Sequence, residues 1–271
     1  MSFAPGHISL TFAIKDAADP LKMGSTGLGI ILPQGVYCSV VDEGSEINEN
    51  IVFEGNKEID DPVVLRALEL LGHGDRGLSI YLRRDLPIGS GFGISGASAL
   101  AACIELDNDL ERCKMAAHQA EIEYKTGLGD VVAISAALDG GNFPIIVERK
   151  SPGANGEVTK HPVNSKLAIC ISGLGRNTSD IITSPEWIEI INTVSSNLEI
   201  LDYDIRSVIK VGRTFTEKSG LIDENLVEIL DSIPLGAVSS IAHLGTSVVA
   251  ISDNIAELSK CLETYGEVRI Y

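Results

Sequence analysis

The segment PIGSGFGISGASALAACIEL, residues 87–106, constrains the fold of this chain more than any other stretch. Gly91, Gly93 and Gly96 lie close together in it and lead directly into an alanine-rich apolar run of helical character. Glycine allows φ > 0 and lets a ligand approach the backbone closely. The first N–H groups of the following helix lack internal partners, and its N-terminus carries about half a positive charge. The segment therefore predicts an anion site at the start of a helix, with a phosphate chain as the favoured ligand.

Other glycine-loop patterns fit this segment less well. It satisfies G-x-G-x-x-G after a strand-like run at 77–84, but a dinucleotide-binding turn follows its strand almost directly, whereas residues 85–88 intervene here. The acid expected about 20 residues further on would be Glu111, inside a helical stretch. The chain contains no G-K-[S/T] triplet and no H-R-D or D-F-G motif, which argues against a Walker loop and a protein-kinase loop. A glycine-rich turn that only packs a helix against a sheet stays open as the structural alternative.

Carboxylates in a second segment, residues 118–141, have the spacing to complement a phosphate loop. Glu121 and Glu123 lie near the end of a helical run, and Asp130 opens the next apolar run. Taken alone, such residues are usually a solvated helix face and a helix N-cap. Phosphoryl transfer, however, needs hard oxygen ligands for a divalent cation and a carboxylate near the acceptor hydroxyl. Ser95, Glu121 and Asp130 supply one hydroxyl and two carboxylates for that chemistry.

Composition and charge indicate a small-molecule enzyme of a reducing compartment. The net charge of −17 repels nucleic acid and anionic membranes, so neither is expected as a partner. The five cysteines are odd in number and never in C-x-x-C spacing, which argues against disulfides and zinc sites and for the cytoplasm. No apolar run approaches the length of a membrane span, and no signal-peptide pattern opens the chain. A homodimer is compatible with the sequence.

The order of predicted elements indicates two α/β halves. The first half has strand-like runs at 7–14, 27–32, 36–42, 50–54, 77–84 and 143–148 and helical runs at 95–106, 110–125 and 130–138. The second has strand-like runs at 166–172, 236–241, 247–251 and 267–271 and helical runs at 185–200, 204–218, 223–232 and 254–264. A polar segment at 148–165, rich in Pro, Gly and Asn, is predicted to link them. The β-β-α-β order at the end predicts helices packed on an antiparallel sheet, and the chain as a whole is predicted to be α+β.

Several motifs together resemble the GHMP kinase superfamily, and within it the archaeal pantoate kinases. Pro5-Gly6-His7 resembles the first superfamily motif, a Pro-Gly followed by a basic residue. Residues 87–97 resemble its P-x-x-x-G-L-G-S-S-A phosphate loop, and Glu121 and the run Gly127–Asp130 resemble its glutamate and its S-G-x-D base motif. The PGH and GFGISG wording and the runs TGLGDVVA, NTSDIITSP and GRTFTEKSGLI resemble the pantoate kinases in particular.

The resemblance implies a fold and an activity. The expected fold is α+β, with a ribosomal-S5-like ATP-binding domain over 1–150 and a ferredoxin-like domain over 160–271. The expected reaction is ATP-dependent phosphorylation of pantoate to 4-phosphopantoate in archaeal coenzyme A biosynthesis. Asp130 would accept the proton of the pantoate hydroxyl, and Ser95 and Glu121 would hold Mg²⁺. The ATP phosphates would contact Pro87, Gly89, Ser90, Gly91, Phe92, Gly93, Ile94, Ser95, Gly96 and Ala97.

The acceptor side is less defined by the motifs. His7, Gly24 and Ser25 are assigned to the substrate by the resemblance. A substrate carboxylate needs a cation or a nest of amides, and the sequence does not choose among Arg83, Arg84, Lys125, Arg176 and Arg213. The third superfamily motif is reduced, since the run 236–251 keeps only Gly236 and Gly245, which predicts fewer backbone donors from that side. No role is predicted for His243, which is expected at the rim.

Two alternatives stay open. Another kinase of the same superfamily, with a mevalonate- or homoserine-type acceptor, would keep every catalytic residue and differ only in the acceptor pocket. A nucleotide-binding regulator without catalysis is the second alternative, because a fold does not guarantee a function. The joint presence of Ser95, Glu121 and Asp130 argues against it.

Overall fold

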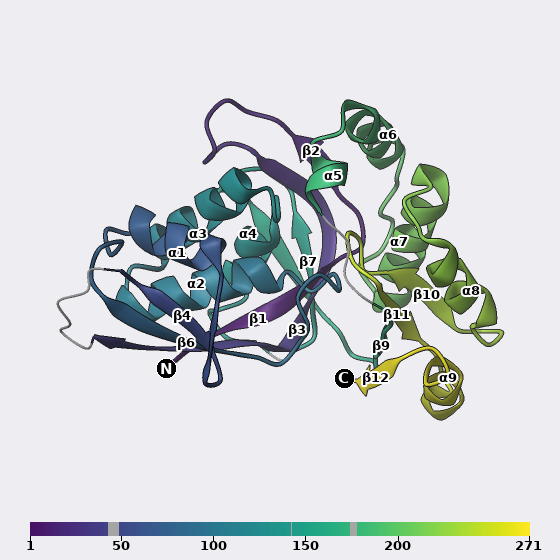
Figure 1. The fold of residues 1–271 in the computed structure, drawn as a ribbon. Coiled ribbons are helices and arrows are strands. Elements are labelled where there is room, and N and C mark those ends of the chain that lie inside the picture. The colour runs from purple at the N-terminus through teal and green to yellow at the C-terminus, as the bar shows by residue number, and fades with distance from the viewer. Residues whose placement is uncertain (43–48, 142, 174–177) are drawn as a thin grey trace.

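A computed structural model describes residues 1–42, 49–141, 143–173 and 178–271. The first half is built on a mixed sheet with the strand order β5-β4-β6-β3-β7-β8, and β1 and β2 also pair with β3. Its strands are β1 (Ser2–Ser9), β2 (Ala13–Lys15), β3 (Gly24–Asp42), β4 (Ile51–Glu54), β5 (Lys57–Ile59), β6 (Leu78–Arg84), β7 (Ile145–Arg149) and β8 (Val158–Pro162). Its helices are α1 (Pro62–Leu70), α2 (Ile94–Leu106), α3 (Leu110–Tyr124) and α4 (Asp130–Ser135). All four helices cover one face of this sheet (Figure 1).

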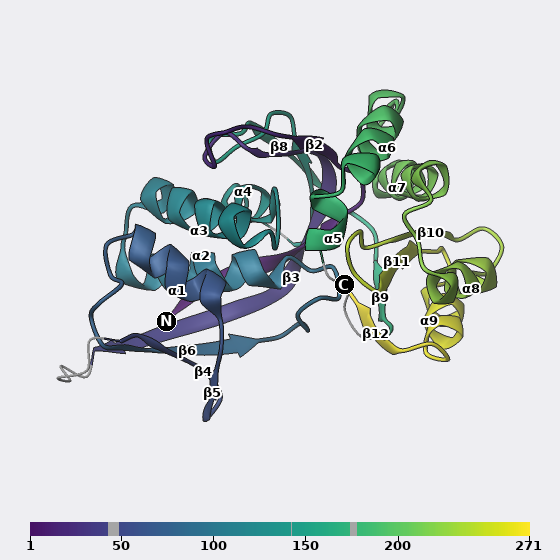
Figure 2. The same ribbon diagram turned by 45° about the horizontal axis from the view of Figure 1, so that its top comes forward.

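The second half is a smaller antiparallel sheet with the order β10-β11-β9-β12. Its strands are β9 (Ala168–Ile171), β10 (Val238–Ile241), β11 (Ser247–Ile251) and β12 (Glu267–Ile270). Its helices are α5 (Ser179–Ile182), α6 (Pro185–Ser196), α7 (Ile205–Ser219), α8 (Glu224–Ser232) and α9 (Ile255–Leu262). Figure 2 shows this sheet with its helices beside the first half. The strand order is that of ferredoxin-like folds, and the α+β prediction is confirmed.

The long strand β3 forms the centre of the first half. The sequence patterns at 27–32 and 36–42 predicted two strands, but the chain runs through Pro33 without a break. β1 pairs antiparallel with β3 along most of its length, with a register shift between Pro5 and His7. A bulge of this kind bends a strand and re-aims the side chains next to it. The bulge lies next to His7, whose backbone N–H donates to the Phe92 carbonyl just before α2, and it therefore affects where the His7 side chain points.

The segment 148–165 is not a linker, contrary to the sequence prediction. β7 continues to Arg149, and β8 pairs with it antiparallel, from Ile145 opposite Pro162 to Arg149 opposite Val158. β8 forms one end of the sheet, where alternate apolar residues are not required, and its polar composition therefore resembles that of a connection. The domain ranges 1–150 and 160–271 stay predictions, but this hairpin places Val158–Pro162 with the first sheet.

Among the described residues, one buried apolar cluster extends through both halves, and another lies within the second half alone. Leu167 just before β9, Ile169 within β9 and Val208 of α7 belong to the same buried cluster as Leu10 and Leu28 of the first half. Such continuity couples the halves, because separating them would expose apolar surface at about 25 cal/mol per Å². In the described ranges, no helix combines the length and the apolar character that a bilayer crossing requires.

Candidate active site

A cavity of about 370 Å³ opens at the start of α2 and is lined by residues of both halves. The predicted phosphate loop contributes Gly89, Gly91, Phe92, Gly93, Ile94 and Ser95, and the two predicted carboxylates, Glu121 and Asp130, also reach it. Pro87, Ser90, Gly96 and Ala97 belong to the same loop but do not line the cavity. The structure thus brings the hydroxyl and both carboxylates of the sequence prediction to one place.

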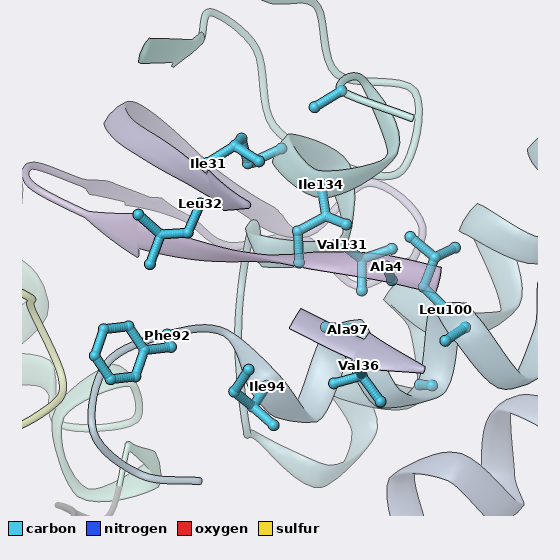
Figure 3. Packing of buried hydrophobic residues seen from close by; sticks show 14 of the residues in the cluster. Ala4, Ile31, Leu32, Val36, Phe92, Ile94, Ala97, Leu100, Val131 and Ile134 are labelled. Atoms are coloured by element: carbon cyan, nitrogen blue, oxygen red, sulfur yellow. The ribbon is translucent and has the colours of Figure 1, made fainter. Parts of the chain in front are cut away.

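The backbone of the loop takes the conformations for which glycine is needed. Gly89, Gly91 and Gly93 have φ of 78°, 91° and 61°. The side chains of Phe92, between Gly91 and Gly93, and of Ile94, the first residue of α2, are buried in the apolar core (Figure 3). Gly93 is the N-cap residue of α2 and offers no side-chain hydrogen bond to the helix. The first N–H groups of α2 therefore keep their capacity to bind an anion in the cavity.

The turn between β10 and β11 of the second half packs against the backbone of the phosphate loop. Gly245 lies so close to Ser90 and Gly91 that an added Cβ would overlap their backbone atoms. A Cβ on Gly91 would in turn lie 2.8 Å from Cβ of Ala242. Gly245, one of the two glycines kept in the reduced third motif, thus allows the backbone of this turn to contact the backbone of the phosphate loop. The contact joins the second half to the loop.

His243 in this turn is not a rim residue, contrary to the sequence expectation. It is 3% exposed and its ring packs edge-on against Phe215, with the ring centroids 4.7 Å apart. Its backbone N–H donates to the Ser9 carbonyl over 2.9 Å, and its Nε2 lies 3.2 Å from the Thr216 hydroxyl. His243 is therefore a buried residue that lines the cavity.

Glu121 is a buried carboxylate without a hydrogen bond of normal geometry to any described residue. It is 1% exposed, and both of its oxygens are orphaned. Burial, and next the charge of Asp130, raise the pKa of Glu121 well above its ordinary value. The N–H groups of Gly96 and Val131 and the Thr126 hydroxyl lie close enough to Glu121 to lower its pKa, but they do not outweigh burial and the charge of Asp130. A buried charge left unpaired is costly, so a ligand is expected to complete this site.

Glu123 has the opposite environment. Arg66 donates to it over 2.6 Å at the surface, and this hydrogen bond lowers the pKa of Glu123. Two residues along a helix turn through about 200°, which is why one carboxylate faces the cavity and the other faces solvent.

Asp130 is held by His7, which in turn contacts Arg149. His7 Nδ1 lies 2.7 Å from Asp130 Oδ1, and Arg149 Nη1 lies 3.0 Å from His7 Nε2. The Asp130 side chain is 20% exposed, and its partial burial would by itself raise the pKa of Asp130. The hydrogen bond from His7, the charge of His7 and the charge of Arg149 together outweigh this effect and lower the pKa of Asp130. Burial lowers the pKa of His7 more than Asp130 raises it. At neutral pH the pair is therefore a neutral imidazole and an ionised carboxylate.

The helix-cap interpretation of Asp130 does not hold. The N-cap of α4 is Gly129, and no side-chain hydrogen bond caps this helix. Asp130 lies in the first helical turn, where its charge interacts favourably with the helix dipole. Its side chain is directed to His7 instead of to the backbone of its own helix.

The residues predicted for the substrate lie behind Asp130. His7 and Ser25 are buried and Gly24 packs against the backbone of Leu128, and none of the three lines the cavity. A Cβ on Gly129 would lie 2.5 Å from Ser25 Oγ and 2.7 Å from Arg149 Nε. Ser25, Gly129 and Arg149 thus meet next to the proposed base.

Four of the five candidate cations lie in the described ranges, and of these only Lys125 lines the cavity. Arg83 covers the ring of Tyr37, Arg84 pairs with Asp61 and Arg213 with Glu217. Arg176 lies outside the described residues.

Sequence reasoning missed three groups of residues at the site. The start of α1 contributes Asp60, Asp61 and Val63 to the cavity wall, and Thr178 and Ser179 contribute from the second half. Arg149 was also missed, because nothing in PIIVERK distinguishes it from a surface arginine at the end of a strand. The Asp-Pro pair at 61–62 before an apolar run was a usable helix-start signal.

The orphaned state of Glu121 predicts a variant with raised stability. In the protein without nucleotide or metal, Glu121→Gln should raise the Tm by roughly 2 °C or more. A gain of about 1 kcal/mol in the free energy of unfolding produces a shift of this size in a chain of this length. The pKa of the Glu121 carboxyl is higher in the folded protein than in the unfolded chain. The stability that such a group contributes is fully present below its ordinary pKa and is lost as the pH rises through the raised pKa of the folded state. The gain over wild type should therefore widen between pH 5 and pH 8 in thermal melts.

The matched control is Glu123→Gln, which removes an exposed ion pair worth at most about 1 kcal/mol. It should lower the Tm slightly or leave it unchanged. A Tm that falls for Glu121→Gln at neutral pH would show that Glu121 is already satisfied in the free protein.

Comparison with known proteins identifies the family. The model of the GHMP kinases N-terminal domain matches residues 62–138, which include the phosphate loop, Glu121 and Asp130. A pantoate kinase of Methanocaldococcus jannaschii is 32% identical over 260 residues, covering 92% of each chain. A pantoate kinase of Methanospirillum hungatei is 30% identical over 290 residues, covering 98% of this chain and 91% of the relative.

Solved structures agree in fold. A phosphotransferase related to the coenzyme A biosynthesis pathway superposes with a TM-score of 0.80 at 26% identity, covering 99% of this chain and 94% of the other. Mevalonate kinase of L. major, at 17% identity and a TM-score of 0.61, covers 100% of this chain and 94% of its own and shares the fold. With its phosphate loop and both carboxylates in one cavity and its relatives matched over nearly their full length, the chain belongs to the pantoate kinase family of the GHMP kinases.

Proposed function

We propose that this protein transfers the γ-phosphoryl group of ATP to the primary hydroxyl of pantoate, giving 4-phosphopantoate for coenzyme A synthesis in the archaeal cytoplasm. The observation that carries the proposal is the content of one cavity. It combines an uncapped helix start behind a glycine loop, an orphaned carboxylate at Glu121 and an ionised carboxylate at Asp130 held by His7. Phosphoryl transfer needs chiefly positioning and charge neutralisation, which these groups supply.

The triphosphate would lie along the loop over 87–97 and the start of α2. Gly89, Gly91 and Gly93 line the cavity, and because glycine has no Cβ a ligand can approach their backbone closely. Lys125 also lines the cavity, and we assign it to an anionic group of one of the two substrates. These contacts account for affinity but not for the identity of the acceptor.

Ser95 and Glu121 fit a Mg²⁺ ion. Neither Glu121 oxygen makes a hydrogen bond of ordinary distance and angle within the described residues, and in the same ranges the Ser95 hydroxyl donates to the Thr126 hydroxyl over 3.3 Å. These are hard oxygen donors, and Mg²⁺ commonly takes one or two protein ligands together with phosphate oxygens and water. In the described part of the chain no group of three His, Cys, Asp or Glu side chains is placed to hold a metal ion. When bound, the ion would neutralise the charge that develops on the phosphates.

Asp130 would accept the proton of the acceptor hydroxyl as the phosphoryl group moves. Its lowered pKa keeps it ionised at neutral pH, and His7 restricts its orientation. Gly24 and Ser25 remain our assignment for the acceptor side, because Ser25 lies next to Gly129 and thus close to the base. His7 would serve the acceptor through Asp130.

A screen of acceptors tests the proposed function. ADP release would be measured with pantoate, mevalonate and homoserine at equal concentrations. We expect turnover with pantoate and little with the other two. Turnover with mevalonate or homoserine would overturn the assignment of pantoate as the acceptor. ATP binding without turnover of any acceptor would favour a nucleotide-binding regulator without catalysis.

The metal assignment predicts different effects at the two neighbouring glutamates. Glu121→Gln should raise the Mg²⁺ concentration for half-maximal rate at least about tenfold, since loss of one charged ligand costs more than about 1.4 kcal/mol. Glu123→Gln is the matched control and should leave it unchanged, because its side chain pairs with Arg66 at the surface. Equal effects in a magnesium titration of the rate would remove Glu121 from the metal site.

A further inference from the structure

Two residues of the cavity wall have a backbone conformation that ordinary side chains avoid. Lys125 and Leu244 are the non-glycine residues with positive φ in the described ranges, at 57° and 63°, and both line the cavity. A side chain in the left-handed conformation brings its Cβ close to the following carbonyl oxygen, which glycine avoids. Strained backbone of this kind clusters at functional sites, so both positions are candidates for a role in the cavity.

Packing accounts for Leu244 but not for Lys125. Leu244 lies in the turn between β10 and β11, and its side chain packs against the buried cluster that contains Phe12 and Phe215. Lys125 is exposed, and within the described part of the chain its side chain makes neither an ion pair nor a hydrogen bond. The strain at Lys125 therefore has no counterpart in the packing of the protein itself.

The end of α3 fixes the backbone of Lys125. Lys125 is the C-cap residue, and its N–H donates to the carbonyl oxygens of Glu121 and Ile122. Glycine is the commonest residue in this left-handed position, because it takes the conformation without strain. What a lysine adds here is a long side chain with an ammonium group at the mouth of the cavity.

The charge of Lys125 is opposite to that of the other ionisable side chains around it. Among the described residues that line the cavity, it is the one Lys or Arg. The carboxylates of the same wall are Asp60, Asp61, Glu121 and Asp130. A polyphosphate is repelled by these carboxylates, and phosphoryl transfer needs cations to neutralise it. Apart from a metal ion, Lys125 is the group that can do so in this cavity.

Lys125 lies beside the residues that we assign to the metal. Glu121 is one helical turn before it, and the hydroxyl of the next residue, Thr126, accepts from Ser95 over 3.3 Å. A metal ion in a kinase bridges oxygens of the β- and γ-phosphates, so these phosphates belong on the same side. By contrast, Gly24 and Ser25, assigned to the acceptor, do not line the cavity. The position of Lys125 thus suits the phosphates better than the acceptor carboxylate.

We propose that Lys125 is a ligand of the terminal phosphates of ATP, held by the strained end of α3 so that its ammonium group neutralises phosphate charge. This inference rests on the proposed function in that it takes the cavity as the ATP site. Negative charge stays on the phosphoryl oxygens during transfer, so the same ammonium group should also support kcat.

The first test measures nucleotide binding without an acceptor. Titration calorimetry of the full-length protein with Mg²⁺ gives the Kd for ATP, and competition against ATP gives that for AMP. Lys125→Gln should raise the Kd for ATP at least about tenfold, or roughly 1.4 kcal/mol. The Kd for AMP should stay within about twofold, because AMP lacks the terminal phosphates. An unchanged Kd for ATP, or an equal rise for AMP, would overturn the proposal.

Lys260→Gln is the matched control for net charge. It removes an exposed lysine of α9 that does not line the cavity. Both Kd values should stay at the wild-type level in this variant. If Lys260→Gln weakens ATP as much as Lys125→Gln does, the effect is one of overall charge and the proposal fails.

Steady-state kinetics distinguish the two substrates. Lys125→Gln should raise the KM for ATP and lower kcat, while the KM for pantoate stays within about twofold. A raised KM for pantoate with normal ATP binding would make Lys125 a ligand of the acceptor and overturn the proposal. Failure of the proposed function would look different, since wild type would then not turn over pantoate while the calorimetric comparison of ATP and AMP still applied.

A second variant tests the conformational argument. Lys125→Gly should raise the Tm by about 2 °C, because glycine takes the left-handed conformation without strain. It should also weaken ATP binding as much as Lys125→Gln does. A gain in stability together with a loss of affinity is expected of a residue whose side chain serves the ligand. Normal ATP affinity in Lys125→Gly, or a fall in its Tm, would contradict the proposal.

Discussion

Asp130→Asn is expected to lower kcat by roughly 10²-fold or more, the scale that general-base catalysis contributes. The amide keeps an oxygen that can accept from His7 Nδ1, so the local geometry should survive while the proton acceptor is lost. The Kd for ATP should change little, because Asp130 does not belong to the phosphate loop. Steady-state rates and titration calorimetry on the same preparation measure both quantities.

A near-normal kcat in Asp130→Asn would remove Asp130 from catalysis. Its remaining role would then be electrostatic, as an acid in the first turn of α4. Such a role predicts a small loss of stability and no loss of rate, so a melting curve completes the comparison.

Gly93→Ala is expected to raise the Kd for ATP at least about tenfold, or roughly 1.4 kcal/mol. Gly93 has φ 61°, a left-handed conformation that costs an alanine about 1 kcal/mol. The added methyl would also lie 2.9 Å from Asp130 Oδ1, so kcat should fall together with ATP affinity. Calorimetry, steady-state kinetics and a melting curve on this variant separate the three effects.

Gly220→Ala is the matched control for backbone strain. Gly220 caps α7 with φ 69°, and nothing lies within 4 Å of a Cβ built there. It should lose a similar small amount of stability and keep normal affinity and rate. If Gly93→Ala behaves like this control, the loop is a packing turn and the nucleotide binds elsewhere.

Local signals predicted most of the secondary structure because they lie within the elements themselves. The prediction of helices at 95–106 and 110–125 agrees with α2 and α3 within a residue, since glycine breaks and an Asp N-cap mark their starts. The sequence also predicted that Ser95, Glu121 and Asp130 act together, and the structure brings them to one cavity.

The failures concern features that depend on tertiary contacts. The hairpin of β7 and β8 was taken for a linker because an edge strand needs no apolar alternation. Arg149 carries no local mark of burial, and only the fold places it against His7. α1 is different, because its signal was present at Asp61 and Pro62, where the Asp61 side chain accepts from Val64 N over 3.2 Å. That helix was predictable and was overlooked.

The contact between Gly245 and the phosphate loop has a consequence for synthesis of the chain. The loop at 87–97 leaves the ribosome long before the turn at 242–246 that packs against its backbone. β11 must first join β9 for that turn to have a fixed place. We therefore expect nascent chains that end before β10 to collapse around α2 without binding ATP, so that nucleotide binding begins only when the last strands have been translated.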